Sequence, residues 1–226
     1  MRHMGETTDT EIQHELGTSE RSLVRSRMYF LLAAGFSFPS RQFHSCLADG
    51  TYSEDICAAL AALFPELYVI YKDEIAFSLS TESSFEDFEG SFLSAFEINM
   101  PQPSVSLYEG SYVQRNNRPG LLLEIKGFYR HFGLEMAALV NDLDDTLAAE
   151  LEFMQFLTAK QAQADEQGTD SAPYRLAQRD FLKRHLTAWL PAFSAAAASN
   201  IRNGFFVALA KFVNDFVTRD FTESLS

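Results

Sequence analysis

Apolar residues recur every three or four positions along most of this chain, the spacing that puts them on one face of an α-helix. Near the C-terminus they cover an arc of about 160° on a wheel drawn at 100° per residue. This arc consists of Ile201, Phe205, Phe206, Leu209, Phe212, Val213, Phe216 and Val217. No segment shows the strict alternation of a half-buried strand. The pattern therefore predicts an all-α fold whose last helix, over about 200–218, faces the core.

The same spacing predicts earlier helices at residues 19–38, 53–79, 84–98 and 121–132. Pro65 falls inside the second of these, and we expect it to break the helix or to open a new first turn. Gly133 follows the fourth helix and is a natural stop, because glycine readily takes the left-handed conformation that ends many helices.

A further helix is expected from Asn141, a residue type that caps helix N-termini, to about Gln163. Residues 164–172 have the composition of a linker, and Pro173 suits the first turn of the next helix. Pro191 lies inside that helix pattern, and we expect it to kink or end the helix.

Between these helices, residues 99–119 hold three prolines, several polar residues and two tyrosines, and they show no helical period. A stretch this long without regular structure is uncommon in a compact domain and is often functional. We therefore predict a flexible N-terminal tail at 1–18 and a single compact helical domain at 19–222, with about six to eight helices and a long irregular loop at 99–119.

Composition narrows the class of partner. The 226 residues include 18 Lys or Arg and 31 Asp or Glu, which gives a formal net charge of −13. This charge argues against nucleic acid as the main partner and favours a basic partner. No apolar stretch approaches the ~20 residues of a membrane span, and the polar first twenty residues do not resemble a secretory signal. We expect a cytoplasmic protein without stable membrane insertion.

Signals for catalysis or for a cofactor are missing from the sequence. No two of the five His are spaced as metal ligands on a helix, and no phosphate-binding loop or nucleophile elbow is present. We therefore predict no metal, no cofactor and no catalytic residue.

Two polar residues fall on apolar helix faces. Glu150 lies within the arc formed by the leucines of the helix after residue 141, and His185 lies between Phe181 and Trp189 on the next helix. Because a buried carboxylate needs a partner or must stay protonated, we hypothesise that Glu150 meets His185, or Arg130, in the core. The alternative is that both side chains reach solvent at the edge of the core.

Two other segments carry polar side chains suited to binding a peptide. Asp145, Glu152 and two neighbours, Ala149 and Phe156, would form one stripe on the helix, which is either a groove for a basic and apolar peptide or an ordinary solvated face. In the irregular loop, the segment from Tyr108 to Tyr112 combines two tyrosines with Glu109, which suits adaptable peptide recognition or simply pins the loop to the surface.

Three segments together resemble the redox-enzyme-maturation chaperones, the TorD, DmsD and NarJ group. The string from Asp144 to Met154 resembles the family's central motif, in which an acid and often a His open a helix. Thr146 stands where the family has the His, so this chain has no imidazole at that position. The segments Tyr108–Tyr112 and Phe181–Leu190 look like two further family signatures, in the same order. The likeness covers roughly residues 20–220.

Within that group, the Glu-Leu-Glu-Phe-Met string looks most like chaperones of type II molybdenum enzymes of the dimethyl sulfoxide reductase family. The resemblance implies an all-helical cytoplasmic protein that is not an enzyme. It would bind the apo catalytic subunit of a molybdenum oxidoreductase and its twin-arginine signal peptide, assist cofactor insertion and delay export. Domain-swapped dimers occur among such proteins, so a homodimer stays open.

The resemblance also suggests site residues. It places Tyr108, Tyr112, Asp144 and Asp145 at the surface that binds the client or its signal peptide. To this surface we add Glu109 from the loop and Glu152 from the stripe. It gives Glu150, His185 and Trp189 either a structural or a binding role. Two alternatives remain open: a helical structural or regulatory subunit retained in an oxidoreductase complex, and a small helical enzyme.

Overall fold

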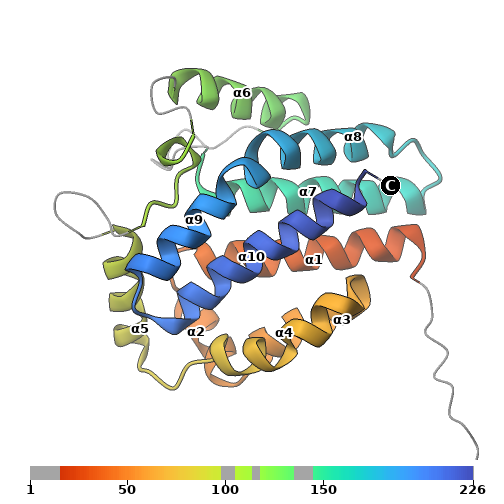
Figure 1. Cartoon of the computed structure of the whole chain (residues 1–226). Coiled ribbons are helices and arrows are strands. Elements are labelled where there is room, and N and C mark those ends of the chain that lie inside the picture. Colours follow the sequence, from red (N-terminus) through yellow and green to blue (C-terminus); the bar gives the residue numbers. More distant parts are fainter. Residues whose placement is uncertain (1–15, 98–104, 114–117, 135–144, 226) are drawn as a thin grey trace, which may run out of the picture.

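The computed structural model describes residues 16–97, 105–113, 118–134 and 145–225, and these residues form an all-α domain (Figure 1). Their ten α-helices are α1 (Thr18–Phe36), α2 (Arg41–Ala48), α3 (Thr51–Leu63), α4 (Pro65–Ser78), α5 (Phe85–Phe92), α6 (Arg118–His131), α7 (Leu147–Glu166), α8 (Ala172–Phe181), α9 (Thr187–Asn200) and α10 (Gly204–Glu223). The described residues also contain two π-helical turns, η1 (Leu93–Glu97) and η3 (Leu182–Leu186), and one 3₁₀ turn, η2 (Glu109–Ser111).

The helices stack in layers around α1, which lies against α7 along much of its length (Figure 1). On one side of this pair, α8 packs on α7, and α6 lies outermost. On the other side, α3 and α4 pair with each other, and α3 packs on α1. The last helix, α10, runs along the front of α1 and pairs with α9. This arrangement buries the apolar arc predicted for the last helix.

Phenylalanine rings fill much of the core where α5 and η1 meet α10. Phe88, Phe92 and Phe96 each lie with their ring centroids within 6 Å of that of Phe206. Most of these contacts are edge-to-face or tilted, the arrangements that the charge distribution of an aromatic ring favours. Twelve of the chain's 21 Phe are buried in the core of this helical domain.

Several predicted boundaries are confirmed. Pro65 opens α4 as a first-turn proline, which separates α3 from α4. Gly133 follows α6 with a positive φ of 73°, as expected for a helix stop. The last helix is confirmed in kind, although α10 begins later and ends later than the range 200–218.

The described residues form ten α-helices, which is more than the predicted six to eight. One reason is α2, which is too short to show a clear apolar period in the sequence. Its start is set locally, because the Ser40 hydroxyl accepts a hydrogen bond from the Phe43 amide at 3.1 Å and so caps the helix.

Pro191 does not end its helix, because α9 continues through Pro191 to Asn200. The irregularity falls earlier, in the π-helical turn η3. There, the Thr187 hydroxyl donates to the carbonyl of Leu182 at 2.8 Å. A π turn relaxes the hydrogen-bond ladder just before the proline, and such turns often coincide with functional positions.

The predicted start of the helix at Asn141 is also wrong. Asn141 lies outside the described residues, and α7 begins at Leu147. Thr146 is its N-cap, since its side chain accepts a hydrogen bond from the Ala149 amide at 3.2 Å. The residue that replaces the family's histidine therefore has a local structural role.

The predicted linker at 164–172 is shorter than expected, because α7 continues to Glu166. Gly168, with a φ of 64°, makes the turn toward α8. Residues 1–15 of the predicted tail lie outside the described residues, and Thr18 already belongs to α1. None of the described helices combines the length and the apolar character needed to cross a membrane.

Candidate functional site

Residues 105–113, which we call the strap, cross the start of α7 and pair with it through the backbone. The Glu109 amide donates to the Asp145 carbonyl at 2.9 Å, and the Leu147 amide donates to the Leu107 carbonyl at 2.8 Å. Tyr108 and Thr146 form an isolated antiparallel bridge between these two bonds. The strap and the start of α7 therefore hold each other in place.

Asp145 fixes the strap with its side chain as well. The carboxylate is fully buried, and its Oδ2 accepts a hydrogen bond from the Gly110 amide at 3.1 Å. Arg118, at the start of α6, donates to both carboxylate oxygens at 3.2 and 3.3 Å. A Cβ on Gly110 would lie 2.9 Å from Asp145 Oδ2, so this close approach requires glycine.

Glu109 points from the strap into the core and meets His185 of η3. His185 Nδ1 lies 3.0 Å from Glu109 Oε2, and both side chains are almost completely buried. Because a carboxylate oxygen is an acceptor, this contact places a proton on Nδ1. On the other side of the ring, Nε2 lies 3.5 Å from Oε1 of Glu124 on α6. The imidazole thus lies between a strap carboxylate and an α6 carboxylate.

Glu150 of α7 lies next to this pair and is also fully buried. Its Oε2 accepts a hydrogen bond from the indole Nε1 of Trp189 at 3.1 Å. Burial raises the pKa of Glu150 well above its ordinary value, and the charge of Glu109 raises it further, while the Trp189 hydrogen bond opposes the shift. Glu150 is therefore the carboxyl group of this cluster that holds a proton.

The hydrogen bonds of the cluster support that assignment. Oε1 of Glu109 and Oε1 of Glu150 are both buried and have no other partner within the described residues. Two ionised carboxylates would leave both atoms without a donor at a cost of several kcal/mol. One proton on Glu150, in a hydrogen bond with the Glu109 side chain, removes the repulsion between the two carboxylates.

Tyr112 closes the cluster on the strap side. Its ring stacks on Trp189 with a centroid distance of 5.4 Å, and its hydroxyl donates to the Ser106 carbonyl at 2.9 Å. Burial raises the pKa of Tyr112 to about 12, so the hydroxyl stays a donor at physiological pH. Tyr108 lies at the outer edge of the strap, where Arg118 packs over its ring at 5.4 Å.

The structure thus brings together most of the residues singled out in the sequence. Glu109, Tyr112, Asp145, Glu150, His185 and Trp189 form one connected group, which we call the clasp, and Tyr108 lies at its edge. Glu152 lies apart from it, exposed on α7. Asp144 lies outside the described residues.

Two expectations about these residues need correction. Glu150 and His185 lie in the same core but do not pair, because Glu109 lies between them. His185 contacts Glu109, and Glu150 accepts a hydrogen bond from Trp189. The alternative partner, Arg130, is exposed. The stripe of Asp145 with Glu152 does not form either, because Asp145 precedes the helix and its carboxylate is buried under the strap.

Three residues of the site escaped the sequence analysis. Arg118 neutralises Asp145, Glu124 contacts His185, and Gly110 allows the strap to approach α7. A single arginine next to a proline or a single glycine in a loop is too common to mark a site. Only the packing of α6 against η3 and the strap gives these residues their partners.

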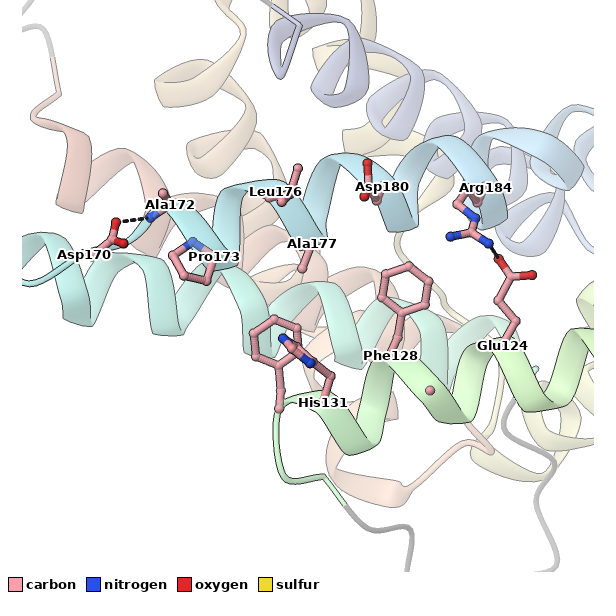
Figure 2. Close-up of a pocket in the computed structure, with 12 residues that line it drawn as sticks. Glu124, Phe128, His131, Asp170, Ala172, Pro173, Leu176, Ala177, Asp180 and Arg184 are labelled. Atoms are coloured by element: carbon pink, nitrogen blue, oxygen red, sulfur yellow. Dashed lines mark hydrogen bonds and ion pairs between the residues drawn. The ribbon is translucent and has the colours of Figure 1, made fainter.

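A surface groove begins where the clasp ends. It lies between α6 and α8, has a volume of about 820 Å³, and is lined by apolar residues with charged residues at its rim (Figure 2). Glu124 connects the groove to the clasp, since it lines the groove, contacts His185 and pairs with Arg184 at 2.5 Å. Within the described ranges, no three His, Cys, Asp or Glu side chains converge as they would around a metal ion.

Buried acids, a tyrosine–tryptophan stack and an apolar groove are suited to binding. The carboxyl groups of Glu109, Asp145 and Glu150 are closed off from solvent by the strap and the helices around it. The groove is open and large enough for side chains of another molecule.

Comparison with known proteins adds an independent line of evidence. Residues 52–195 match the family described as Nitrate reductase delta subunit. The chain is 50% identical over 206 residues to the perchlorate reductase assembly chaperone protein of Dechloromonas aromatica (strain RCB), covering 91% of this chain and 92% of that protein. It is 32% identical over 189 residues to the dimethyl sulfide dehydrogenase assembly chaperone protein of Rhodovulum sulfidophilum, covering 79% and 72%.

A solved structure is similar in fold. The crystal structure of a proposed redox enzyme maturation protein from Archaeoglobus fulgidus aligns with a TM-score of 0.54 at 15% sequence identity. The alignment covers 88% of this chain and 93% of that one. At this identity, the likeness supports the helical fold alone.

Proposed function

This chain belongs to the Nitrate reductase delta subunit family, and we propose that it is an assembly chaperone for the catalytic subunit of a molybdenum oxidoreductase. The observation that carries the proposal is the 50% identity to the perchlorate reductase assembly chaperone protein over nearly the full length of both chains. The relatives named above are assembly chaperones rather than enzymes. We accordingly propose binding without chemistry.

The clasp has a positioning role in this proposal. Glu109 and Asp145 are fully buried, so neither touches a partner while the strap is in place. Instead, they hold Tyr108 and Tyr112 on a segment that lies over the start of α7. Binding would stabilise the apo form of the catalytic subunit as long as its cofactor is scarce. Release would follow when cofactor insertion changes the surface of the subunit.

We also propose that the chaperone holds the twin-arginine signal peptide of its client in the cytoplasm. The net charge of −13 favours a segment with a basic start, and half-buried tyrosines suit its apolar part. Tyr108, Tyr112 and the exposed Glu152 are the contacts we propose in the described part of the chain. Asp144 stays in the proposal on its sequence position alone, and a homodimer stays a proposal on family likeness alone.

The experiment that tests the function is capture of the client in its native host. The tagged protein is purified from cells that are synthesising the oxidoreductase, and each retained subunit is examined by intact mass and by molybdenum content. We expect a large catalytic subunit that carries its signal peptide and lacks molybdenum.

The same experiment separates the alternative. Recovery of signal-cleaved, molybdenum-loaded enzyme in fixed stoichiometry would make this chain a retained subunit instead. Recovery of no oxidoreductase subunit, while the enzyme is being made, would contradict the proposal. Growth without molybdate provides a control, because it should increase the amount of captured apo subunit.

A further inference from the structure

The groove between α6 and α8 has an open apolar floor that the clasp does not use. Phe128 of α6 and Phe132, just after this helix, are half-buried, and Leu176 of α8 keeps 51% of its surface exposed. The α6 residues that line it extend from Glu124 to His131, about two helical turns, or roughly 10 Å at 1.5 Å per residue. Figure 2 shows Phe128 in the space between α6 and α8, with Leu176 at the upper edge of α8. The floor is long enough for two turns of another helix.

Gly127 lies in the middle of this floor and has no structural reason to be glycine. It is in the interior of α6, where glycine costs about 1 kcal/mol relative to alanine. A Cβ at this position would meet nothing within 4 Å, so packing inside the protein does not exclude a side chain. The missing side chain widens the groove instead, which lets the backbone of another molecule approach α6 closely.

The rim of the groove is acidic. Arg184 is neutralised by Glu124 at one end, and Asp170, at the other end, accepts a hydrogen bond from the Ala172 amide. Asp180 is half-buried on the rim and has neither a hydrogen bond nor an ion pair within the described residues. A half-buried carboxylate in this position lacks a counter-charge, and a basic side chain of a partner would supply it.

From this geometry, we propose that the groove binds an amphipathic helix of the catalytic subunit. The apolar face of that helix would rest on Phe128 and Leu176, with a small residue against Gly127 and a lysine or arginine beside Asp180. A helix laid into an apolar groove is a common form of peptide recognition. The inference rests on the proposed function, because it names the surface that the client contacts.

Two matched pairs of variants test it, with purified protein and the apo catalytic subunit captured above. Gly127→Leu fills the floor, while Gly90→Leu makes the same change in α5, where a Cβ also meets nothing within 4 Å. Asp180→Asn removes the rim charge, while Asp73→Asn removes an exposed charge on α4, away from the groove. Thermal melting first establishes that all four variants are folded.

We expect Gly127→Leu to weaken binding of the apo subunit by about tenfold or more, as blocking the centre of an interface does, with an unchanged or higher melting temperature. Asp180→Asn should weaken binding by about threefold or more and reduce its salt dependence. The two control variants should bind like the original protein.

Unchanged binding by folded Gly127→Leu, or equal weakening by Gly90→Leu, would overturn the inference. Loss of self-association without loss of client binding would also overturn it, because the occupant would then be a second copy of this chain. If the unaltered protein fails to bind the apo subunit, the proposed function itself fails. The two failures are therefore distinguishable.

Discussion

Glu150 places a carboxyl group in the core without a counter-ion. Its neighbours are the indole N–H of Trp189, which donates to one oxygen, and the carboxyl group of Glu109, which competes for the same proton. Burial and the nearby charge both disfavour ionisation, so folding favours the protonated form. A residue that the sequence marks only as an acid on an apolar face thus becomes the proton holder of the clasp.

Replacing Glu150 by glutamine tests this assignment through the pH dependence of stability. Because the pKa is raised on folding, the stabilisation is fully present below the ordinary value of 4.5 and is lost as pH rises through the folded value. Glutamine mimics the neutral acid and cannot ionise. We expect Glu150→Gln to gain stability over the original protein as pH rises above 4.5, by up to about 1.4 kcal/mol per pH unit within that window.

Urea unfolding at several pH values, followed by fluorescence of Trp189, measures this difference directly, since Trp189 is the chain's single tryptophan. Glu166→Gln, at the exposed end of α7, is the matched control and should show no such trend. A Glu150→Gln variant whose stability runs parallel to the original protein at every pH would contradict the assignment.

At the scale of elements, α1 and α10 are joined by a polar contact inside the apolar core. Arg25 donates two hydrogen bonds to Asp220, at 2.7 and 2.8 Å, and the Tyr29 hydroxyl donates a third at 2.7 Å. Asp220 is only 2% exposed, so its charge depends on these donors. The contact fixes how α10 lies on α1, and through α10 it fixes α9, which carries Trp189.

Removing Arg25 should therefore destabilise the whole domain. Arg25→Met keeps the length of the side chain but leaves Asp220 buried with Tyr29 alone, and we expect a loss of about 3 kcal/mol in the free energy of unfolding. Arg27→Met is the matched control on the same helix, because Arg27 and Asp55 form an exposed pair worth less than about 1 kcal/mol.

Urea denaturation of both variants measures the two losses. Adding Asp220→Asn to Arg25→Met should restore part of the stability, because it removes the uncompensated charge. Equal losses for Arg25→Met and Arg27→Met would show that burial of the pair does not matter.

For the whole molecule, the excess of acidic residues governs how partners approach. A net charge of −13 creates a negative potential that attracts basic segments, and salt screens it over about 8 Å at physiological ionic strength. Ion pairs on the surface, such as Arg41 with Glu86, contribute little to the free energy of folding because solvent screens them. The charge is therefore a property of association more than of stability.

This predicts a specific kinetic signature for binding of the apo catalytic subunit. The association rate should fall by about tenfold or more between 20 mM and 500 mM salt, while the dissociation rate changes little. Surface plasmon resonance at several salt concentrations, with sucrose as an uncharged control solute, measures both rates. An association rate independent of salt would contradict electrostatic attraction of the client.

The fold class and most of the helices follow from local features of the sequence. Apolar spacing is a local property, and it marks a helix such as α10 wherever the apolar face is continuous. Proline and glycine also act locally, which is why the breaks at Pro65 and Gly133 were predictable. The order of three short motifs further sufficed to indicate the family, and the comparisons confirm it.

Which polar groups meet depends instead on how the helices and the strap pack together. Glu109 and His185 are 76 residues apart in the chain, so a local sequence pattern cannot predict that the strap brings them together. For the same reason, the start of α7 was misplaced, because Asp145 is held by Gly110 and Arg118 rather than by its own helix. The groove, too, exists only where α6 lies against α8, since two helix surfaces must be packed side by side before the space between them has a shape.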